Sequence, residues 1–180
     1  VDDNLFYARD IIERQIHHLS HLVDDLLDVS RITLGKVTLQ KQPIEMASII
    51  SRAVETNRPS IDARRHQLTV SLPPKGVRVE ADPTRLAQVV GNLLTNAAKY
   101  TDEGGRIDVG VRAERGEMVL SVRDTGIGID PALFRSIFDL FGQADRSLER
   151  AQGGLGIGLS LVQRLVELHR GTVAVHSDGP

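Results

Sequence analysis

The sequence predicts a mixed α/β protein that is preceded by one long amphipathic helix. Three observations lead to this prediction: a heptad repeat of apolar residues over positions 4–33, an apolar helical stripe over positions 82–100, and an alternating run, Met118, Leu120 and Val122, that ends in a glycine turn. A period of about 3.6 residues indicates a helix, and a period of two indicates a strand with one apolar face. The same two periods assign the remaining elements in chain order.

Composition narrows the functional classes before any motif is considered. The chain has 180 residues, is 41% hydrophobic and 26% charged, and carries a net charge of −2. These values are ordinary for a globular protein, and we expect no nucleic-acid partner. Cysteine is absent, so the chain can form neither a disulfide nor a thiolate metal site. No apolar run approaches the ~20 residues of a membrane span, and no signal peptide is visible.

Residues 4–33 are expected to form the long amphipathic helix. Its apolar stripe consists of Leu5, Ala8, Ile12, Ile16, Leu19, Leu22, Val23, Leu26 and Val29, with Gln15 as the single polar position. Three apolar positions per heptad are typical of a helix in a bundle. Because a single helix cannot bury such a stripe, we expect it to pack against another chain, as in a homodimer, or against a helix outside this sequence.

Strands and one helix follow the glycine at position 35. We expect a strand over residues 37–44, a helix over residues 46–65 with a kink at Pro59, and a pair of strands over residues 67–72 and 77–80. The segment Pro73-Pro74-Lys75-Gly76 between the last two strands is rich in turn-forming residues. It therefore predicts that these two strands pair with each other.

Asp82 and Pro83 predict the start of the next helix, because an acceptor side chain followed by proline is a common N-terminal sequence. One face of this helix is apolar, whereas another carries Asn92, Asn96 and Lys99, with Tyr100 four residues after Asn96. Asparagine is a poor helix former. Two asparagines on one face therefore suggest a ligand, and the alternative is that both are merely solvated.

A hairpin of residues 106–111 and 117–122 leads to Asp124, which we expect at the tip of a buried strand and therefore itself buried. Burying a carboxylate without a donor costs several kcal/mol or more. Gly126 and Gly128 remove the side chains that would keep a ligand away from the backbone. This arrangement suggests a flat ligand whose amine donates to Asp124, although a purely structural turn is the commoner meaning of such glycines.

The last third of the chain predicts a helix, a long loop, a second helix and a strand. Asp130 and Pro131 begin a helix that continues towards Phe138, and residues 142–153 form a polar loop of a length typical of a functional lid or of a disordered segment. The glycine-rich run of residues 153–159 opens a helix that extends to Leu168, and its free amides form an anion site. Residues 171–176 are expected to be a strand.

These elements converge on the chemistry of one ligand. Asp124 accepts from an amine, the glycine-rich run offers amides to phosphates, and Asn92 and Asn96 offer the neutral oxygen atoms that Mg²⁺ takes. A base with an amine, phosphates and Mg²⁺ together indicate ATP. The glycine pattern has neither the Lys-Ser/Thr of the phosphate loop nor the strand context of the dinucleotide fingerprint.

Four motifs resemble the boxes of the ATP-binding domain of sensor histidine kinases, in the order and at the spacing of that family. They are Asn92-Leu-Leu-Thr-Asn-Ala-Ala-Lys-Tyr-Thr101, Asp124-Thr-Gly-Ile-Gly128, Phe138-Asp-Leu-Phe141 and Gly153-Gly-Leu-Gly-Ile-Gly-Leu159. Residues 4–33 resemble the second helix of the dimerisation and phosphoacceptor domain. The sequence Arg146-Ser-Leu-Glu-Arg150 in the predicted lid is similar to that of the hybrid, multi-domain branch of this family. The resemblance divides the chain into a partial dimerisation domain, residues 1–35, and an ATP-binding catalytic domain, residues 36–180.

The resemblance implies a two-layer sandwich of the Bergerat type, in which helices cover a mixed sheet and ATP lies beneath a mobile lid. It implies Asn96 and Asn92 as magnesium ligands and as catalytic residues together with Lys99. The nucleotide contacts that it implies are Asn96, Lys99, Tyr100, Asp124, Gly126, Gly128, Arg146, Arg150, Gly154, Leu155, Gly156, Gly158 and Leu159. Of these, Asp124 receives the adenine amine, Tyr100 lies near the base, and Lys99 and the glycine-rich run face the phosphates.

The implied reaction transfers the γ-phosphoryl group of ATP to a histidine and then to an aspartate of a response regulator receiver domain. Catalysis of this kind is mostly positioning and charge stabilisation. The implied partners are that receiver domain, a phosphoacceptor histidine helix and a second copy of the chain. The resemblance implies a cytoplasmic location, with any membrane tether in parts of the parent protein outside this sequence.

Three departures from the family qualify this interpretation. The family's acceptor histidine is followed by Glu or Asp, whereas none of the six histidines here has an acidic residue after it. We therefore expect that the acceptor helix is absent and that the chain alone does not phosphorylate itself. The sequence stops before the family's final strand, and Leu155 replaces a residue that is polar in many members.

Two other functions remain open at this point. The first is ATP hydrolysis, as in the related gyrase, mismatch-repair and heat-shock chaperone ATPases. Those enzymes place a glutamate four residues before the magnesium asparagine, and here that position is Asn92, which cannot act as a base. The second is a module that binds nucleotide or dimerises without any activity.

Overall fold

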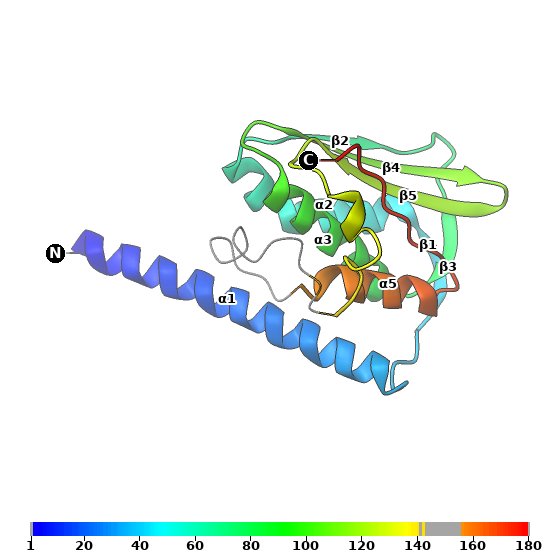
Figure 1. Cartoon of the computed structure of the whole chain (residues 1–180), viewed down its shortest axis with the longest axis horizontal. Helices are drawn as coiled ribbons and strands as arrows, with labels where there is room; N and C mark the ends of the chain where they lie inside the picture. Colours follow the sequence, from blue (N-terminus) through cyan, green and yellow to red (C-terminus); the bar gives the residue numbers. More distant parts are fainter. Residues whose placement is uncertain (1, 141, 143–155, 180) are drawn as a thin grey trace.

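The computed structural model describes residues 2–140, 142 and 156–179, and it arranges them as a long helix beside a body of helices and strands (Figure 1). In chain order the elements are α1 (Asp2–Thr33), β1 (Gln42–Glu45), α2 (Met46–Ala63), β2 (Gln67–Ser71), β3 (Arg78–Ala81), α3 (Pro83–Tyr100), β4 (Arg106–Glu114), β5 (Glu117–Asp124), the 3₁₀ turn η1 (Pro131–Leu133) and α5 (Gly158–Leu168).

The strands form two sheets. β1 pairs antiparallel with β3, while β4 lies between β2, to which it is parallel, and β5, to which it is antiparallel. The predicted hairpin of β4 and β5 is confirmed. The predicted pairing of β2 with β3 is wrong. The predicted turn between these two strands does form, since the Gly76 amide donates to the Pro73 carbonyl at 3.0 Å. The chain leaves this turn towards α2, where the Met46 amide donates to the Val77 carbonyl at 3.0 Å.

One layer of helices covers the inner face of the three-stranded sheet (Figure 1). Its central member is α3, which contacts α2 on one side and α5 on the other. The core joins apolar side chains of all these elements, and its most deeply buried members are Met46, Ile50, Ile61, Val90, Leu94, Ile107, Val109, Leu161, Val162 and Leu165. Burying an aliphatic side chain of this size contributes about 1.5–3 kcal/mol, so α3 is held from three directions.

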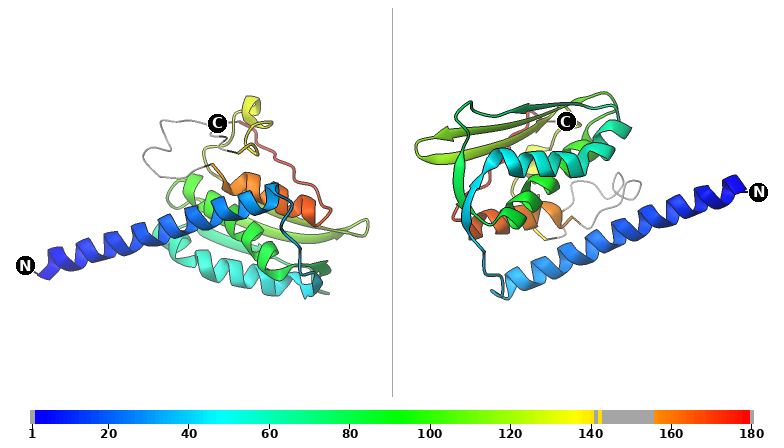
Figure 2. Two further views of the ribbon diagram at one scale, coloured as in Figure 1. Left: turned by 90° about the horizontal axis from the view of Figure 1, so that it is seen from below. Right: turned by 180° about the vertical axis from the view of Figure 1, so that it is seen from behind.

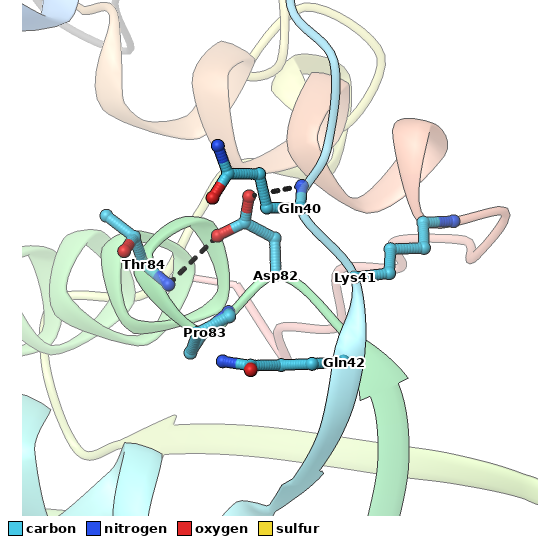
Figure 3. Close-up of a pocket in the computed structure, with 6 residues that line it drawn as sticks. All are labelled: Gln40, Lys41, Gln42, Asp82, Pro83 and Thr84. Atoms are coloured by element: carbon cyan, nitrogen blue, oxygen red, sulfur yellow. Dashed lines mark hydrogen bonds between the residues drawn. The ribbon is translucent and has the colours of Figure 1, made fainter.

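Asp82 begins α3 and also anchors the segment that leads into the body. Its Oδ1 atom accepts from the amides of Thr84 and Arg85 at 3.0 and 3.1 Å, as the sequence predicts for an N-cap. Its Oδ2 atom accepts from the Gln40 amide at 2.9 Å, and Figure 3 shows the bonds to Gln40 and Thr84. Burial raises the pKa of Asp82, but these three hydrogen bonds and the charge of Arg85 outweigh it, so the pKa lies below its ordinary value.

A shallow pocket of about 200 Å³ opens beside Asp82. It is lined by Gln40, Lys41, Gln42, Asp82, Pro83 and Thr84 (Figure 3). Both carboxylate oxygens of Asp82 are already occupied by backbone amides. The pocket therefore forms where the segment before β1 packs against the start of α3, and none of the predicted nucleotide-binding residues lines it.

The long helix α1 touches the body only near its C-terminal end, and its first turns project beyond the other elements (Figures 1 and 2). Ile12, Ile16 and Leu19 are exposed, whereas Val29 is buried in the core. The prediction that Val29 packs against another chain or an absent helix is thus wrong, because the last turns of α1 lie against α5. Among the described residues, no helix combines the length and the apolar character that crossing a membrane requires.

A half-buried ion pair joins α1 to α3. Asp28 Oδ2 accepts from Arg85 Nη1 at 2.6 Å and from Gln88 Nε2 at 2.9 Å. Burial raises the pKa of Asp28, but these hydrogen bonds and the charges of Arg85 and Arg31 outweigh it, so the pKa lies below its ordinary value. A lowered carboxyl pKa means that the pair stabilises the fold above the unfolded-state pKa and ceases to do so as the pH falls through the folded-state pKa.

We therefore expect Asp28→Asn to lower the free energy of unfolding by about 1–2 kcal/mol at neutral pH, because the amide keeps an acceptor but loses the charge. The difference from wild type should shrink as the pH falls below ~4, where the unfolded carboxyl also becomes protonated. Urea unfolding at several pH values measures it. Asp24→Asn, one turn earlier and exposed, is the control. A difference that persists at low pH would contradict the assignment to the charge.

Three predicted elements differ from the structure. The strand expected over residues 37–44 is restricted to Gln42–Glu45. The helix expected after Asp130 is only the 3₁₀ turn η1; Asp130 Oδ1 does accept from the Ala132 amide at 2.8 Å, but successive turns replace the helix as the chain continues. Residues 171–176 keep the burial alternation of a strand, with Val173 and Val175 half-buried, but pair with no strand among the described residues.

Candidate functional site

The end of α3 meets the glycine turn that follows β5. The Ile127 amide donates to the carbonyl of Tyr100, the last residue of α3, at 3.2 Å. A Cβ atom at Gly126 would lie 2.3 Å from that same carbonyl oxygen, which no side chain could tolerate. Glycine at this position is what lets the turn come into contact with the helix, so Tyr100 and the turn form one wall of the site.

Asp124 lies at this junction with part of its carboxylate available. Oδ1 accepts from the Gly126 amide at 2.9 Å, and Oδ2 takes no hydrogen bond from the other described residues. The expectation that Asp124 is buried is wrong, because the side chain is exposed. It continues the row of Met118, Leu120 and Val122 along β5, but those three side chains are half-buried whereas Asp124 is exposed. The carboxylate therefore needs no internal donor and can accept from a ligand.

The far side of the turn is held by the C-terminal segment. Gly128 has a φ of +71°, and a Cβ atom there would lie 2.2 Å from the carbonyl oxygen of Gly179. Ser177 Oγ accepts from the Ile129 amide at 3.0 Å. No sequence pattern identified Ser177 as a supporting residue, because its partner is 48 positions away along the chain.

Lys99 and Tyr100 lie against each other at the end of α3. Lys99 Nζ donates to the Tyr100 hydroxyl at 2.9 Å and is 4.6 Å from the centre of its ring. An ammonium group in this position is attracted both by the hydroxyl oxygen and by the face of the ring. The structure thus places the Lys99 charge beside Tyr100, at the same end of the site as Asp124.

The opposite end of the site is where α3 passes the start of α5. Asn92 Nδ2 donates to the Gly158 carbonyl at 3.4 Å, and a Cβ atom at Gly158 would meet Asn92 only at 3.9 Å. Asn96 is half-buried and lies one turn beyond Asn92 and one turn before Tyr100, about 6 Å along the helix axis from each. Asn92 therefore stands at the α5 end of the site, and Asn96 lies between it and the Asp124 end on the same helix.

Part of the predicted site lies outside the described residues. Arg146, Arg150, Gly154 and Leu155 belong to this part, as does Phe141. Gly156, with a φ of +66°, and the half-buried Leu159 flank the start of α5. The first amides of α5 and the positive end of its dipole are suited to an anion.

The donor set fits a magnesium-bound nucleotide. Mg²⁺ takes hard oxygen ligands and retains several waters, so two amide oxygens can be sufficient protein ligands beside phosphate. In the part of the chain that the structure describes, no three or more His, Cys, Asp or Glu side chains gather as a metal site. Asn92 and Asn96 are the candidate ligands because they carry amide oxygens on the one helix that joins the two ends of the site, and Asp124 with the glycine turn is the candidate receptor for an amine-bearing base.

Comparisons with known proteins identify the family of this chain. The family model of histidine kinase-, DNA gyrase B-, and HSP90-like ATPases matches residues 81–179. The circadian input-output histidine kinase CikA of Synechococcus elongatus is 37% identical over 163 residues, which cover 89% of this chain and 22% of that protein. The chain spans about a fifth of the length of such curated relatives.

Two solved structures share the fold. The mycobacterial sensor histidine kinase MprB is 28% identical with a TM-score of 0.67, over 76% of this chain and 85% of that chain. Full-length ShkA, in complex with AMPPNP, is 29% identical with a TM-score of 0.74, over 88% of this chain and 33% of that chain. The predicted fold class, a mixed sheet covered by helices, is therefore confirmed.

Proposed function

Because the chain belongs to the family of histidine kinase-, DNA gyrase B-, and HSP90-like ATPases, we propose that it is the ATP-binding catalytic part of a sensor histidine kinase. The observation that carries the proposal is the double contact of α3. Its C-terminal residue, Tyr100, meets the turn of Asp124, and its middle residue, Asn92, meets the start of α5. One rigid helix thus spans the distance between a receptor for a base and a receptor for phosphates.

In this proposal each end of α3 has its own role. Asp124 accepts from the adenine amine through the oxygen that the Gly126 amide leaves available, and Gly126 and Gly128 let the base approach the backbone. Asn96 and Asn92 hold Mg²⁺, which when bound neutralises charge on the phosphate oxygens. Lys99 adds positive charge to the site, and Gly156, Gly158 and Leu159 present amides of the α5 start. The predicted contacts from Arg146, Arg150, Gly154 and Leu155 belong to the same phosphate receptor in this proposal.

We favour phosphoryl transfer over ATP hydrolysis. The relatives that support the family are named as histidine kinases, and the position that a water-activating glutamate would occupy is Asn92. An amide cannot accept a proton from water at neutral pH. The activity, the transfer from histidine to a response regulator aspartate, and the cytoplasmic location of this part of the parent protein are proposed on the same grounds.

The division at residue 35 and the homodimer belong to the same proposal. Ile12, Ile16, Leu19 and Leu26 are each about half exposed on α1, and covering such side chains stabilises a complex by up to ~1.5–3 kcal/mol each. We expect light scattering to show a dimer at high concentration and Leu19→Glu to weaken it. Leu34→Glu, which changes an equally exposed leucine just after the helix, is the control. A strict monomer with α1 helical would contradict the homodimer.

The proposed activity can be tested in trans. The chain, supplied with an acceptor domain that carries the missing histidine helix, is expected to label that domain from γ-labelled ATP with the acid lability of phosphohistidine. The rate should be low, because docking in trans lacks the effective concentration that a tether provides. The chain alone should remain unlabelled, since none of its histidines has an acidic neighbour.

Each other outcome selects a different function. Acid-stable label on the chain itself would indicate a serine or threonine kinase. Release of phosphate without any label would favour the ATPase. Bound ATP with neither label nor phosphate release would favour a module that only binds nucleotide.

A further inference from the structure

We propose that Arg64 is a positioning residue for the nucleotide site, because its guanidinium gathers the carbonyl groups at the end of α3 and thereby sets Tyr100 against the glycine turn. Arg64 is half-buried and is the residue that follows the last residue of α2. The inference rests on the proposed function and adds to it a residue that no motif of the site contains.

The contacts of Arg64 are concentrated on one turn of backbone. Its Nη1 atom donates to the carbonyl oxygens of Ala98, Lys99 and Thr101 at 2.9, 2.6 and 3.2 Å. The last carbonyls of a helix have no partner within the helix and carry the negative end of its dipole. A guanidinium at this position satisfies them with charge-assisted hydrogen bonds, which are about twice as strong as neutral ones.

The carbonyls that Arg64 binds lie on both sides of Tyr100, and this position links Arg64 to the site. Arg64 binds the carbonyls on both sides of Tyr100 but not the Tyr100 carbonyl itself, which accepts from the Ile127 amide at 3.2 Å. Arg64 therefore holds the helix end through the carbonyls of Lys99 and Thr101, while the carbonyl of Tyr100 between them binds the turn that carries Asp124. If Arg64 is removed, the peptide planes beside Tyr100 can rotate, and the Tyr100 ring moves relative to Asp124.

The backbone around Arg64 is fixed in turn by the segment that it supports. The Gly104 amide donates to the Arg64 carbonyl at 2.9 Å, and the Gln67 amide donates to the Gly105 carbonyl at 2.9 Å. The buried His66 places Nε2 within 3.1 Å of the Ala98 carbonyl oxygen. The segment after α2 and the segment after α3 thus each donate hydrogen bonds to the other. These bonds fix the backbone of Arg64 and thereby the position of its guanidinium.

The neighbouring arginine offers a matched control. Arg65 is largely exposed, and within the described part of the chain its guanidinium pairs with Glu103 at 3.4 Å, in a surface pair whose contribution is expected to be small. Replacing Arg64 or Arg65 by methionine removes the same charge and keeps a long aliphatic side chain. Arg64→Lys keeps the charge but replaces the planar guanidinium by a compact, more strongly hydrated ammonium group that does not extend as far from the backbone.

The experiment measures the dissociation constants of ADP and adenosine by calorimetry, well below the melting temperature of each variant. Arg64→Met is expected to weaken both ligands by the same factor, roughly tenfold, which is typical when a supporting residue behind a binding group is removed. Arg64→Lys should recover part of this loss, and Arg65→Met should bind like wild type. A merely structural role would lower the melting temperature of Arg64→Met and leave both constants of the folded protein unchanged.

A second readout reports the position of Tyr100 without any ligand. The chain has two tyrosines, so 3-fluorotyrosine in a Tyr7→Phe background gives a single fluorine resonance from Tyr100. Arg64→Met should shift or broaden it, and Arg65→Met should not. If Arg64→Met does not fold, Arg64→Lys decides.

The outcomes separate the two proposals. Wild-type binding with unchanged constants in Arg64→Met and an unmoved resonance would overturn the role of Arg64 and leave the proposed function intact. A folded wild-type chain that binds neither ADP nor adenosine would contradict the proposed function, and the role of Arg64 falls with it.

Discussion

Asp124→Ala is expected to remove most of the nucleotide binding of this chain. In the proposed complex the carboxylate is the group that receives the amine of the base, and its Oδ2 atom takes no hydrogen bond from the other described residues. Alanine leaves the amine without a charged acceptor and also frees the Gly126 amide, so the floor of the site loses one of its fixed points. Losing a hydrogen bond to a charged group costs about 1.5–3 kcal/mol, before any rearrangement of the turn.

Thermal unfolding with and without Mg²⁺-ADP measures this effect. A ligand at a hundredfold excess over its Kd adds ~2.7 kcal/mol to the free energy of unfolding of the wild-type chain. For a chain of this length, that corresponds to a rise in Tm of roughly 5–10 °C. Asp124→Ala should show little of this rise. Glu117→Ala, which removes an exposed carboxylate at the other end of β5, should keep it.

Asp124→Asn separates the turn from the ligand. The amide oxygen can still accept from the Gly126 amide, so the local structure is retained while the charge is lost. We expect a Tm rise between those of wild type and Asp124→Ala. Equal ligand-induced shifts in wild type and Asp124→Ala would remove the assignment of Asp124 to the base.

Asn96→Ala is expected to abolish phosphoryl transfer and to remove the magnesium-dependent part of nucleotide affinity. Asn96 lies between the two ends of the site on α3, and in the proposal its amide oxygen is a metal ligand. Asn92→Ala should have the same effect to a smaller degree, because the Asn92 amide also contacts Gly158 at 3.4 Å. Alanine favours a helix more than asparagine does, by up to ~0.7 kcal/mol, so lost binding is not expected to reflect an unfolded helix.

The measurement compares triphosphate affinity in Mg²⁺ with affinity after chelation. Wild type should bind more tightly with Mg²⁺, and Asn96→Ala should bind equally weakly in both conditions. Gln88→Ala, which removes an amide from the same helix where it faces Asp28 of α1, is the control and should respond to Mg²⁺ as wild type does. Triphosphate affinity of the wild-type chain that does not change on chelation would show that the asparagines hold no metal.

Local patterns in the sequence determined the parts of this protein that depend on neighbouring residues. Asp82 and Pro83 predicted the start of α3 because an N-cap acts on amides two and three positions away. The alternation that ends at Asp124 predicted the β4–β5 hairpin for the same reason. The order and spacing of the four motifs identified the sensor histidine kinase resemblance, which the comparisons confirm.

Tertiary structure alone decided which distant segments meet. β2 pairs with β4 in parallel because that register lets Leu68 join Ile107 and Val109 over the helices, and no turn signal near Pro73 encodes this choice. Residues 171–176 keep a strand-like alternation, but a strand needs a backbone partner as well as a pattern.

The same reason explains why the support of the site was invisible in the sequence. Arg64 is 34 to 37 positions from the carbonyls that it binds, and Asp28 is 57 from Arg85. From the sequence alone, Arg64 at the end of one helix and Asp28 near the end of another look like ordinary surface residues. They acquire their partners only when burial of the apolar faces of α2, α3 and α5 brings the helix ends together, and that burial is a property of the whole chain.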